Sequence, residues 1–183
     1  MRSVILIAVS VIIFWVDIGE CKENAFENFK NLAASNQRFW TQSRNWDEVT
    51  ADGKECRYVL KSKNLQMEPT VKNYRFDQCY RAEGGRRECV HLFGTLYKEN
   101  RMPKLYLYRE GTDYARNYTL DYWNSGEKCF VLTMAGNGES PKCELNVYDT
   151  MEPKIVKACE KRYSEICHGE KYDVFVNCDR MFP

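Results

Sequence analysis

The sequence lacks the residue patterns on which most enzymes and metal sites depend. Its 183 residues include only two histidines, His91 and His168, and no Cys-x-x-Cys pair, so we expect no metal site. There is also no Gly-x-Ser-x-Gly segment and no histidine suited to act as a general base. These absences predict a protein that is not an enzyme and that binds no cofactor.

Charge excludes a further class of partner. The 27 basic and 26 acidic residues nearly cancel, which leaves a formal net charge of +1 at neutral pH. No basic stripe is visible, and the Gly-Gly-Arg-Arg run at 84–87 is typical of a solvated turn. We therefore expect no nucleic-acid partner.

The longest apolar run lies near the N-terminus. Val4–Val16 is too short to span a bilayer, and it follows the basic start at residues 1–3. Gly19 and Cys21 have small side chains, and they occupy the third and the first position before a predicted cleavage site. The pattern predicts a secretory signal peptide over residues 1–21 and one extracellular domain over residues 22–183, with no membrane partner.

Cleavage after Cys21 leaves an even number of cysteines in an oxidising compartment. They are Cys56, Cys79, Cys89, Cys129, Cys143, Cys159, Cys167 and Cys178. Up to four disulfides follow, and the sequence alone permits on the order of a hundred pairings. We favour Cys79–Cys89 across a predicted hairpin and Cys143–Cys167 from a strand to a helix end.

Extended segments dominate the predicted secondary structure. Alternation and turn signals predict eight strands, at residues 38–46, 54–63, 70–81, 87–98, 104–109, 113–123, 128–135 and 142–149. Amphipathic spacing predicts a helix at Asn24–Ser35, which closes one end, and a helix at Glu152–Cys167, before a short strand at Tyr172–Cys178. Because a sheet of this size avoids exposed edges by closing, we expect a mainly β, eight-stranded antiparallel barrel that holds one small ligand, with the C-terminal helix on the outside.

This order of elements resembles that of the lipocalins, and the C-terminal part is similar to the tick salivary histamine-binding lipocalins. The signature of that family runs from a Cys-Asp-aliphatic triplet through a Glu-Leu-aromatic triplet to a helical cysteine. The matching positions are Cys129-Phe130-Val131, Glu144-Leu145-Asn146 and Cys159. The resemblance implies the disulfides Cys129–Cys159 and Cys56–Cys178, and ligand contacts at positions 130, 144 and 146.

Side chains alternate along a strand, so one fixed position predicts which neighbours face the interior. Asn117-Tyr118-Thr119 is the only N-glycosylation sequon, and a glycan on Asn117 has to point outward. The inward set on that strand is then Tyr114, Arg116, Tyr118, Leu120 and Tyr122.

The next two strands are phased by Cys129, which points outward if it reaches the helix. The predicted inward residues are Phe130, Leu132, Met134, Glu144, Asn146 and Tyr148. The outward residues Leu145 and Val147 then meet the apolar stripe of the helix. We expect this stripe to consist of Ile155, Val156, Cys159, Tyr163 and Ile166.

Glu144 favours an amine ligand, because a buried ammonium requires a compensating carboxylate. Phe130 and Asn146, however, stand where the family has an Asp and an aromatic residue. An inward Arg116 favours a carboxylate instead, as in a fatty acid or an eicosanoid of leukotriene type. Two interpretations without a ligand stay open: Glu144 and Arg116 pair with each other, or the inward aromatic residues simply fill the barrel.

We expect a secreted, monomeric glycoprotein. The resemblance implies that it acts in tick saliva, where it sequesters a host inflammatory or haemostatic mediator and so evades host defence. We expect histamine or serotonin as the ligand, with a lipid mediator, or a protein captured by the rim loops, as alternatives. The candidate ligand-binding residues are Glu144, Asn146, Phe130, Tyr118, Arg116, Tyr122, Trp46 and Tyr148.

Overall fold

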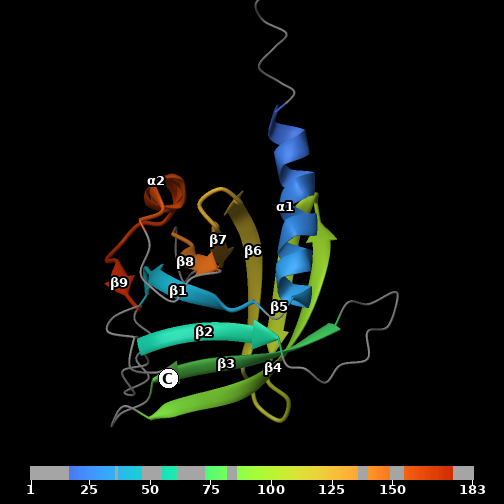
Figure 1. Ribbon diagram of the computed structural model, residues 1–183, viewed down its shortest axis with the longest axis vertical. Coiled ribbons are helices and arrows are strands. Elements are labelled where there is room, and N and C mark those ends of the chain that lie inside the picture. The colour runs from blue at the N-terminus through green and yellow to red at the C-terminus, as the bar shows by residue number, and fades with distance from the viewer. Residues whose placement is uncertain are drawn as a thin grey trace, which may run out of the picture.

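The computed structural model describes residues 17–35, 37–46, 55–61, 73–81, 86–135, 140–148 and 155–174. Within these residues the chain forms two helices and nine strands (Figure 1). The elements are α1 Asp17–Ala34, β1 Phe39–Arg44, β2 Glu55–Lys61, β3 Asn73–Arg81, β4 Arg87–Glu99, β5 Met102–Tyr108, β6 Ala115–Asn124, β7 Cys129–Met134, β8 Lys142–Tyr148, α2 Lys157–Ile166 and β9 Tyr172–Asp173. Neither helix in this part of the chain is long and apolar enough to cross a membrane.

All nine strands belong to one curled antiparallel sheet. From β2 to β8 each strand pairs with its neighbour in the chain, and β1 follows β8 in the sheet. β1 also pairs with β2, at Phe39 with Val59 and at Trp40 with Tyr58. The predicted order of helix, eight strands, helix and short strand is confirmed, and Figure 1 shows the strands curling around an interior.

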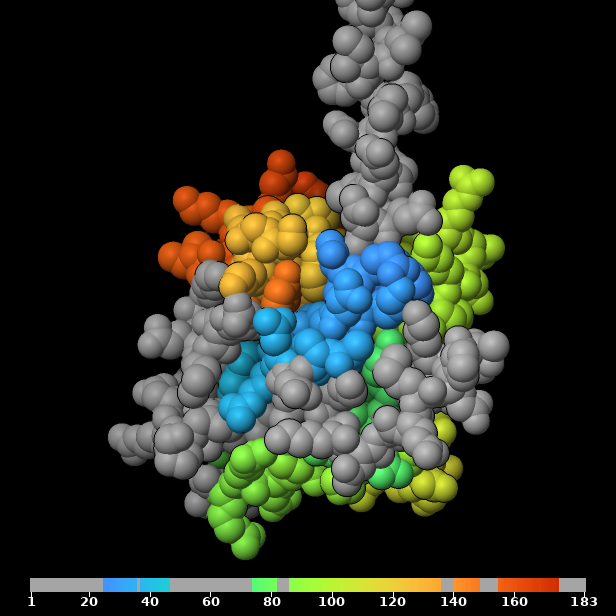
Figure 2. All heavy atoms as spheres, turned by 45° about the vertical axis from the view of Figure 1, so that its right-hand side comes forward, coloured from blue at the N-terminus to red at the C-terminus, as the bar shows by residue number. Residues whose placement is uncertain are grey.

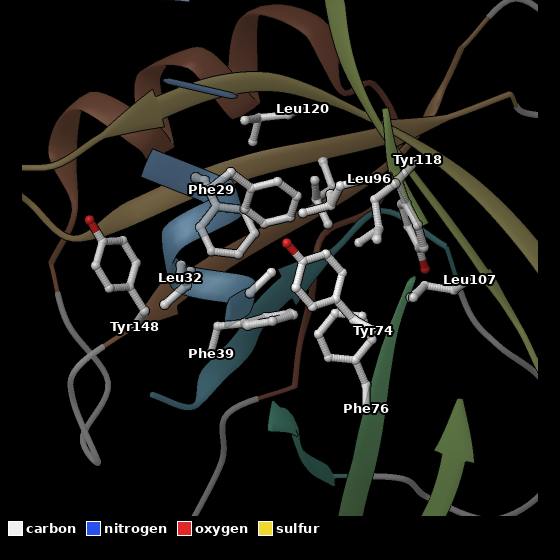
Figure 3. Close-up of a cluster of buried hydrophobic side chains, with 14 of the residues drawn as sticks. Phe29, Leu32, Phe39, Tyr74, Phe76, Leu96, Leu107, Tyr118, Leu120 and Tyr148 are labelled. Carbon is white, nitrogen blue, oxygen red and sulfur yellow. The ribbon is translucent and has the colours of Figure 1, made fainter. Parts of the chain in front are cut away.

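The inner face of the sheet is lined by large apolar side chains (Figure 3). This inner cluster contains Phe39, Tyr74, Phe76, Leu92, Leu96, Leu105, Leu107, Tyr118, Leu120, Phe130, Leu132 and Tyr148, together with Phe29, Leu32 and Ala33 of α1. Gly94 lies among them, because a Cβ at that position would approach Phe76 Cε2 to 2.4 Å. The inner face is therefore packed closely enough for one strand position to require glycine.

Helix α1 covers this inner cluster. It begins at Asp17, seven positions before the predicted Asn24, but its apolar residues Phe29, Leu32 and Ala33 pack inward as the helical spacing predicts. The ammonium of Lys98 lies 4.9 Å from the centre of the Phe26 ring. Figure 2 shows the described part of α1 (blue) seated between the β4–β5 hairpin (yellow-green) and the β6–β7 segment (yellow to orange).

Helix α2 covers the outer face of β7 and β8. The outer cluster joins Val131, Leu145 and Val147 of these strands to Val156, Cys159 and Tyr163, as the predicted phase requires. Ile155 was expected in the same stripe, but it precedes the helix, which begins at Lys157, and is 78% exposed. The helical spacing therefore does not extend to Ile155.

Three disulfides join the cysteines whose side chains the structure describes. Cys79–Cys89 links directly opposed residues of β3 and β4, while Cys129–Cys159 and Cys143–Cys167 attach α2 to β7 and β8. All three are the expected pairs. The fourth expected pair, Cys56–Cys178, includes Cys178, which lies outside the described residues.

Candidate ligand-binding interior

A buried carboxylate lies on the inner face of β8. Glu144 is only 3% exposed, and the hydroxyl of Tyr118 on β6 donates a hydrogen bond to its Oε1 over 3.1 Å. Leu132 of β7 stands between the two strands, since it pairs with Leu120 on one side and with Glu144 on the other. The hydrogen bond therefore spans three strands and fixes one carboxylate oxygen in the interior.

A cation belongs to the same region, although the sequence did not predict it. Arg44 of β1 is the register partner of Glu144, so the two side chains share one face of the sheet, and Arg44 is 8% exposed. A β-bulge between Thr41 and Ser43 changes the phase of β1 and turns Arg44 to that face. The interior thus contains a guanidinium opposite a carboxylate.

Two further polar side chains continue this inner region. The Thr41 hydroxyl donates to Asn146 Oδ1 over 3.2 Å, and Asn146 Nδ2 donates to the backbone carbonyl of Glu144 over 3.3 Å. Both residues are buried. These bonds hold the Asn146 amide against β8, so that it braces the segment that carries Glu144.

Stacked rings form the neighbouring wall. The rings of Trp123, Phe130 and Tyr148 form a triangle, with centroid distances of 5.5 Å from Trp123 to Phe130, 5.0 Å from Trp123 to Tyr148 and 6.3 Å from Phe130 to Tyr148. Phe29 of α1 approaches Phe130 to 5.2 Å. Such a stack offers ring faces to an aromatic or cationic group.

The prediction that Tyr122 faces the interior is wrong. A bulge between Leu120 and Tyr122 shifts the phase of β6, so that Tyr122 packs against the outer cluster and Trp123 against the inner one. Before the bulge, Tyr118 and Leu120 face inward as predicted. This single bulge therefore places Trp123 on the inner face and Tyr122 on the outer face.

Two buried polar atoms of the inner cluster have no hydrogen-bond partner among the described residues. They are Tyr74 Oη and Trp123 Nε1. Figure 3 shows the Tyr74 hydroxyl pointing toward the middle of the cluster. Burial raises the pKa of Tyr74, with smaller opposing effects of Lys30 and Glu27, so this hydroxyl stays protonated at neutral pH. Because buried polar groups are normally satisfied, these two atoms suit polar atoms of a ligand.

The structure brings most of the predicted ligand residues together. Glu144, Asn146, Phe130, Tyr118 and Tyr148 all lie on the inner face. Of the residues that the sequence did not indicate, Trp123 and Arg44 are turned inward by bulges, which leave no pattern in the sequence. Tyr74 could have been found from the alternation along its strand.

Arg116 and Trp46 complete the predicted set. Arg116 has the predicted phase, since its register partner Leu107 belongs to the inner cluster, but it lies near the start of β6 and is partly exposed. Its guanidinium donates to the Ala115 carbonyl over 3.1 Å and lies 4.7 Å from the Tyr114 ring centre. Trp46 is buried just beyond β1, with the Arg44 guanidinium 6.0 Å from its ring centre. Trp46 therefore lies beside Arg44 and belongs to neither the inner nor the outer cluster.

The family model described as Tick histamine binding protein matches residues 22–179. No curated protein sequence matches this chain significantly. The family match includes every residue of the inner region described above.

Several solved structures share the fold. Lobster apocrustacyanin A1 is 13% identical, with a TM-score of 0.57 over 88% of this chain and 92% of its own. Japanin from Rhipicephalus appendiculatus, solved with bound cholesterol, is 11% identical, with a TM-score of 0.56 over 81% of this chain and 97% of its own. Apocrustacyanin C1 is 13% identical, with a TM-score of 0.56 and coverages of 88% and 92%. At these identities the likeness concerns the fold.

Proposed function

The chain belongs to the tick histamine-binding protein family, and on that premise we propose that it is a secreted lipocalin that sequesters a biogenic amine of the histamine or serotonin type. Family and fold are those of small-ligand binders, not of enzymes. One observation carries the choice of ligand: the Glu144 carboxylate, held by Tyr118, lies buried beside a wall of aromatic rings. An ammonium and an aromatic ring in one small molecule match these two features.

The proposal also covers the form of the mature protein. The signal peptide is removed after Cys21, and residues 22–183 form a single, monomeric domain. The eight main strands close into a barrel, for which the pairing of β1 with both β8 and β2 is the support. The ligand is a mediator at a feeding site, a role that rests on family membership.

The two unpartnered polar atoms of the inner cluster specify the ligand further. Trp123 Nε1 is a hydrogen-bond donor only, whereas Tyr74 Oη both donates and accepts. Histamine has an imidazole whose nitrogens can accept from one group and donate to another. Serotonin offers a hydroxyl and an indole N–H for the same purpose.

A second candidate is an anionic lipid, such as a fatty acid or an eicosanoid. Arg44 lies opposite Glu144, and a guanidinium in that position opposes an ammonium and attracts a carboxylate. The leucines of the inner cluster would then contact the apolar chain of the ligand. Japanin, which shares the fold, was solved with cholesterol, an apolar ligand.

Calorimetric titration of the disulfide-intact protein with histamine, serotonin and arachidonate separates the two candidates. For an amine ligand, Glu144→Gln removes most of the binding and Arg44→Gln strengthens it, because a competing cation is lost. The matched control is Glu110→Gln, which neutralises an exposed carboxylate and leaves the affinity unchanged.

The opposite result identifies the lipid candidate. Arachidonate binding that Arg44→Gln abolishes, with no heat from either amine, overturns the amine proposal. Amine binding that persists in Glu144→Gln would overturn the assignment of the site. If none of the three ligands gives a binding signal, a protein partner captured through the rim loops is favoured.

A further inference from the structure

An aromatic ladder crosses the outer face of β4 and β5. Phe93 and Tyr108 are register partners with ring centres 5.3 Å apart, and Tyr106 stacks on Tyr108 at 5.7 Å. Tyr106 and Tyr108 are each 38% exposed. Among the described residues, Ile155 is the one other large hydrophobic side chain that is exposed. The ladder is thus an apolar surface that faces outward, away from the inner cluster.

The glycosylation sequon lies beside this ladder. Asn117 is exposed on β6 and is the register partner of Tyr106 on β5. Tyr118, the middle residue of the sequon, faces inward, so Asn117 and Thr119 face outward. Directly opposed side chains of an antiparallel pair have Cβ atoms about 4.5–5.5 Å apart, so a sugar joined to Asn117 is within reach of the Tyr106 ring.

The Asn117 amide is also oriented. The Tyr97 hydroxyl donates to Asn117 Oδ1 over 3.2 Å. This bond uses the amide oxygen, which remains an acceptor after glycosylation. The amide nitrogen, to which N-linked sugars are joined, takes no part in it.

We propose that Asn117 carries an N-glycan whose first sugar packs on Tyr106, with the ladder through Tyr108 to Phe93 continuing beneath the glycan. In the transfer, Asn117 Nδ2 loses a proton and bonds to C1 of N-acetylglucosamine, while the bond from C1 to the pyrophosphate of a lipid-linked oligosaccharide breaks. One face of this sugar presents C–H groups, and covering an aromatic ring with them removes apolar area from water. The inference rests on entry into the secretory pathway, which is part of the proposed function.

In this arrangement two different groups cover the outer face of the sheet. Helix α2 covers β7 and β8, and the glycan covers β4 to β6. Both lie on the opposite face from Glu144. The glycan therefore stabilises the sheet without contacting the ligand.

The test uses the full chain secreted from insect cells. Intact mass before and after enzymatic glycan removal reports occupancy, which Asn117→Gln abolishes and Thr119→Ser retains. Tyr106→Ala is then measured with Asn117 intact and with Asn117→Gln. We expect Tyr106→Ala to lower Tm by about 3 °C more in the glycosylated protein. Ile155→Ala, an exposed apolar control, lowers Tm equally in both backgrounds.

An unmodified Asn117 in the secreted protein, or an equal loss of Tm from Tyr106→Ala in both backgrounds, overturns the proposal. Both results leave the amine proposal untouched, because the ligand lies on the other face. A failed amine titration likewise leaves the glycan result standing. Retention of the chain inside the cell overturns this inference together with the secretion on which it rests.

Discussion

Arg44 and Glu144 lie directly opposite each other on β1 and β8, and both side chains are buried. Two opposite charges in one low-dielectric region attract strongly, but each loses its hydration. A ligand that carries a charge therefore has to displace or share one member of this pair. We expect this pair to decide which sign of charge a ligand of the interior can carry.

The first prediction concerns the stability of this pair. Glu144→Leu or Arg44→Met alone leaves a buried charge without its opposite, and we expect each to lower the free energy of unfolding by about 3 kcal/mol. The double variant loses less than the sum, because no uncompensated charge remains. Urea unfolding of the four proteins measures the coupling, and additive losses would show that the two charges do not interact.

The second prediction concerns the hydroxyl of Tyr74. Tyr74→Phe removes a buried polar atom without a partner among the described residues, so we expect the unliganded protein to be unchanged or up to about 1 kcal/mol more stable. The amine affinity falls about fivefold, since the ligand loses one hydrogen bond. Tyr163→Phe is the control, because its equally unpartnered hydroxyl lies in the outer cluster. An affinity loss in both variants would contradict the assignment.

The third prediction concerns stability in alkali. Burial, and next the negative charges of Glu144 and Asp173, raise the pKa of Tyr163 above its ordinary value of 10.0. As pH rises above about 10, the unfolded chain loses this proton while the folded protein keeps it. The stabilisation is thus complete below that pH and is lost above it.

Tyr163→Phe abolishes this contribution. Between pH values of about 10 and 11 its free energy of unfolding falls less steeply than that of the wild type, by up to about 1.4 kcal/mol per pH unit. Denaturant unfolding at several pH values measures the difference. Parallel curves for the two proteins would contradict the shifted pKa.

The fourth prediction concerns Gly94. An added Cβ would lie 2.4 Å from Phe76 Cε2 and 2.8 Å from Leu107 Cδ2, so Gly94→Ala forces buried side chains apart. We expect a loss of about 1–3 kcal/mol in the free energy of unfolding. Gly126→Ala is the control, because its Cβ would meet only Asn124 Oδ1, at 3.4 Å. Equal effects of the two substitutions would show that the inner face has room at Gly94.

The fifth prediction compares two disulfides. Cys129–Cys159 spans 30 residues and Cys79–Cys89 spans 10. In the chain-entropy description the longer loop contributes about 1 kcal/mol more stability. Paired Cys→Ala variants measure both losses by urea unfolding. If removal of the short-loop disulfide costs more, strain or packing outweighs loop entropy.

On strands with regular alternation, the sequence correctly predicted which side chains face the interior. On β7 and β8 the outward positions of Cys129 and Cys143 fix the phase, and Phe130 and Glu144 face inward as expected. Each of these strands pairs with the other without a register shift, so a single fixed residue phases the whole hairpin.

Phase prediction failed where the backbone contains an extra residue. Because of the bulge on β6, Trp123 and not Tyr122 faces the interior. The bulge on β1 turns Arg44 to the face of Glu144. Arg116, which precedes the bulge on β6, keeps its predicted phase opposite Leu107. A bulge arises from the fit of one strand to its neighbour, so residues within a single strand do not reveal it.

The attachment of α2 has a consequence for how this interior can change. Cys129 precedes Phe130, and Cys143 precedes Glu144, so each disulfide on the outer face adjoins a residue of the inner face. The two disulfides fix the backbone position of residues 130 and 144, whichever side chains these residues carry. The disulfides therefore keep the backbone of residues 130 and 144 attached to α2 when these side chains are substituted, whatever stability the lost side-chain contacts cost.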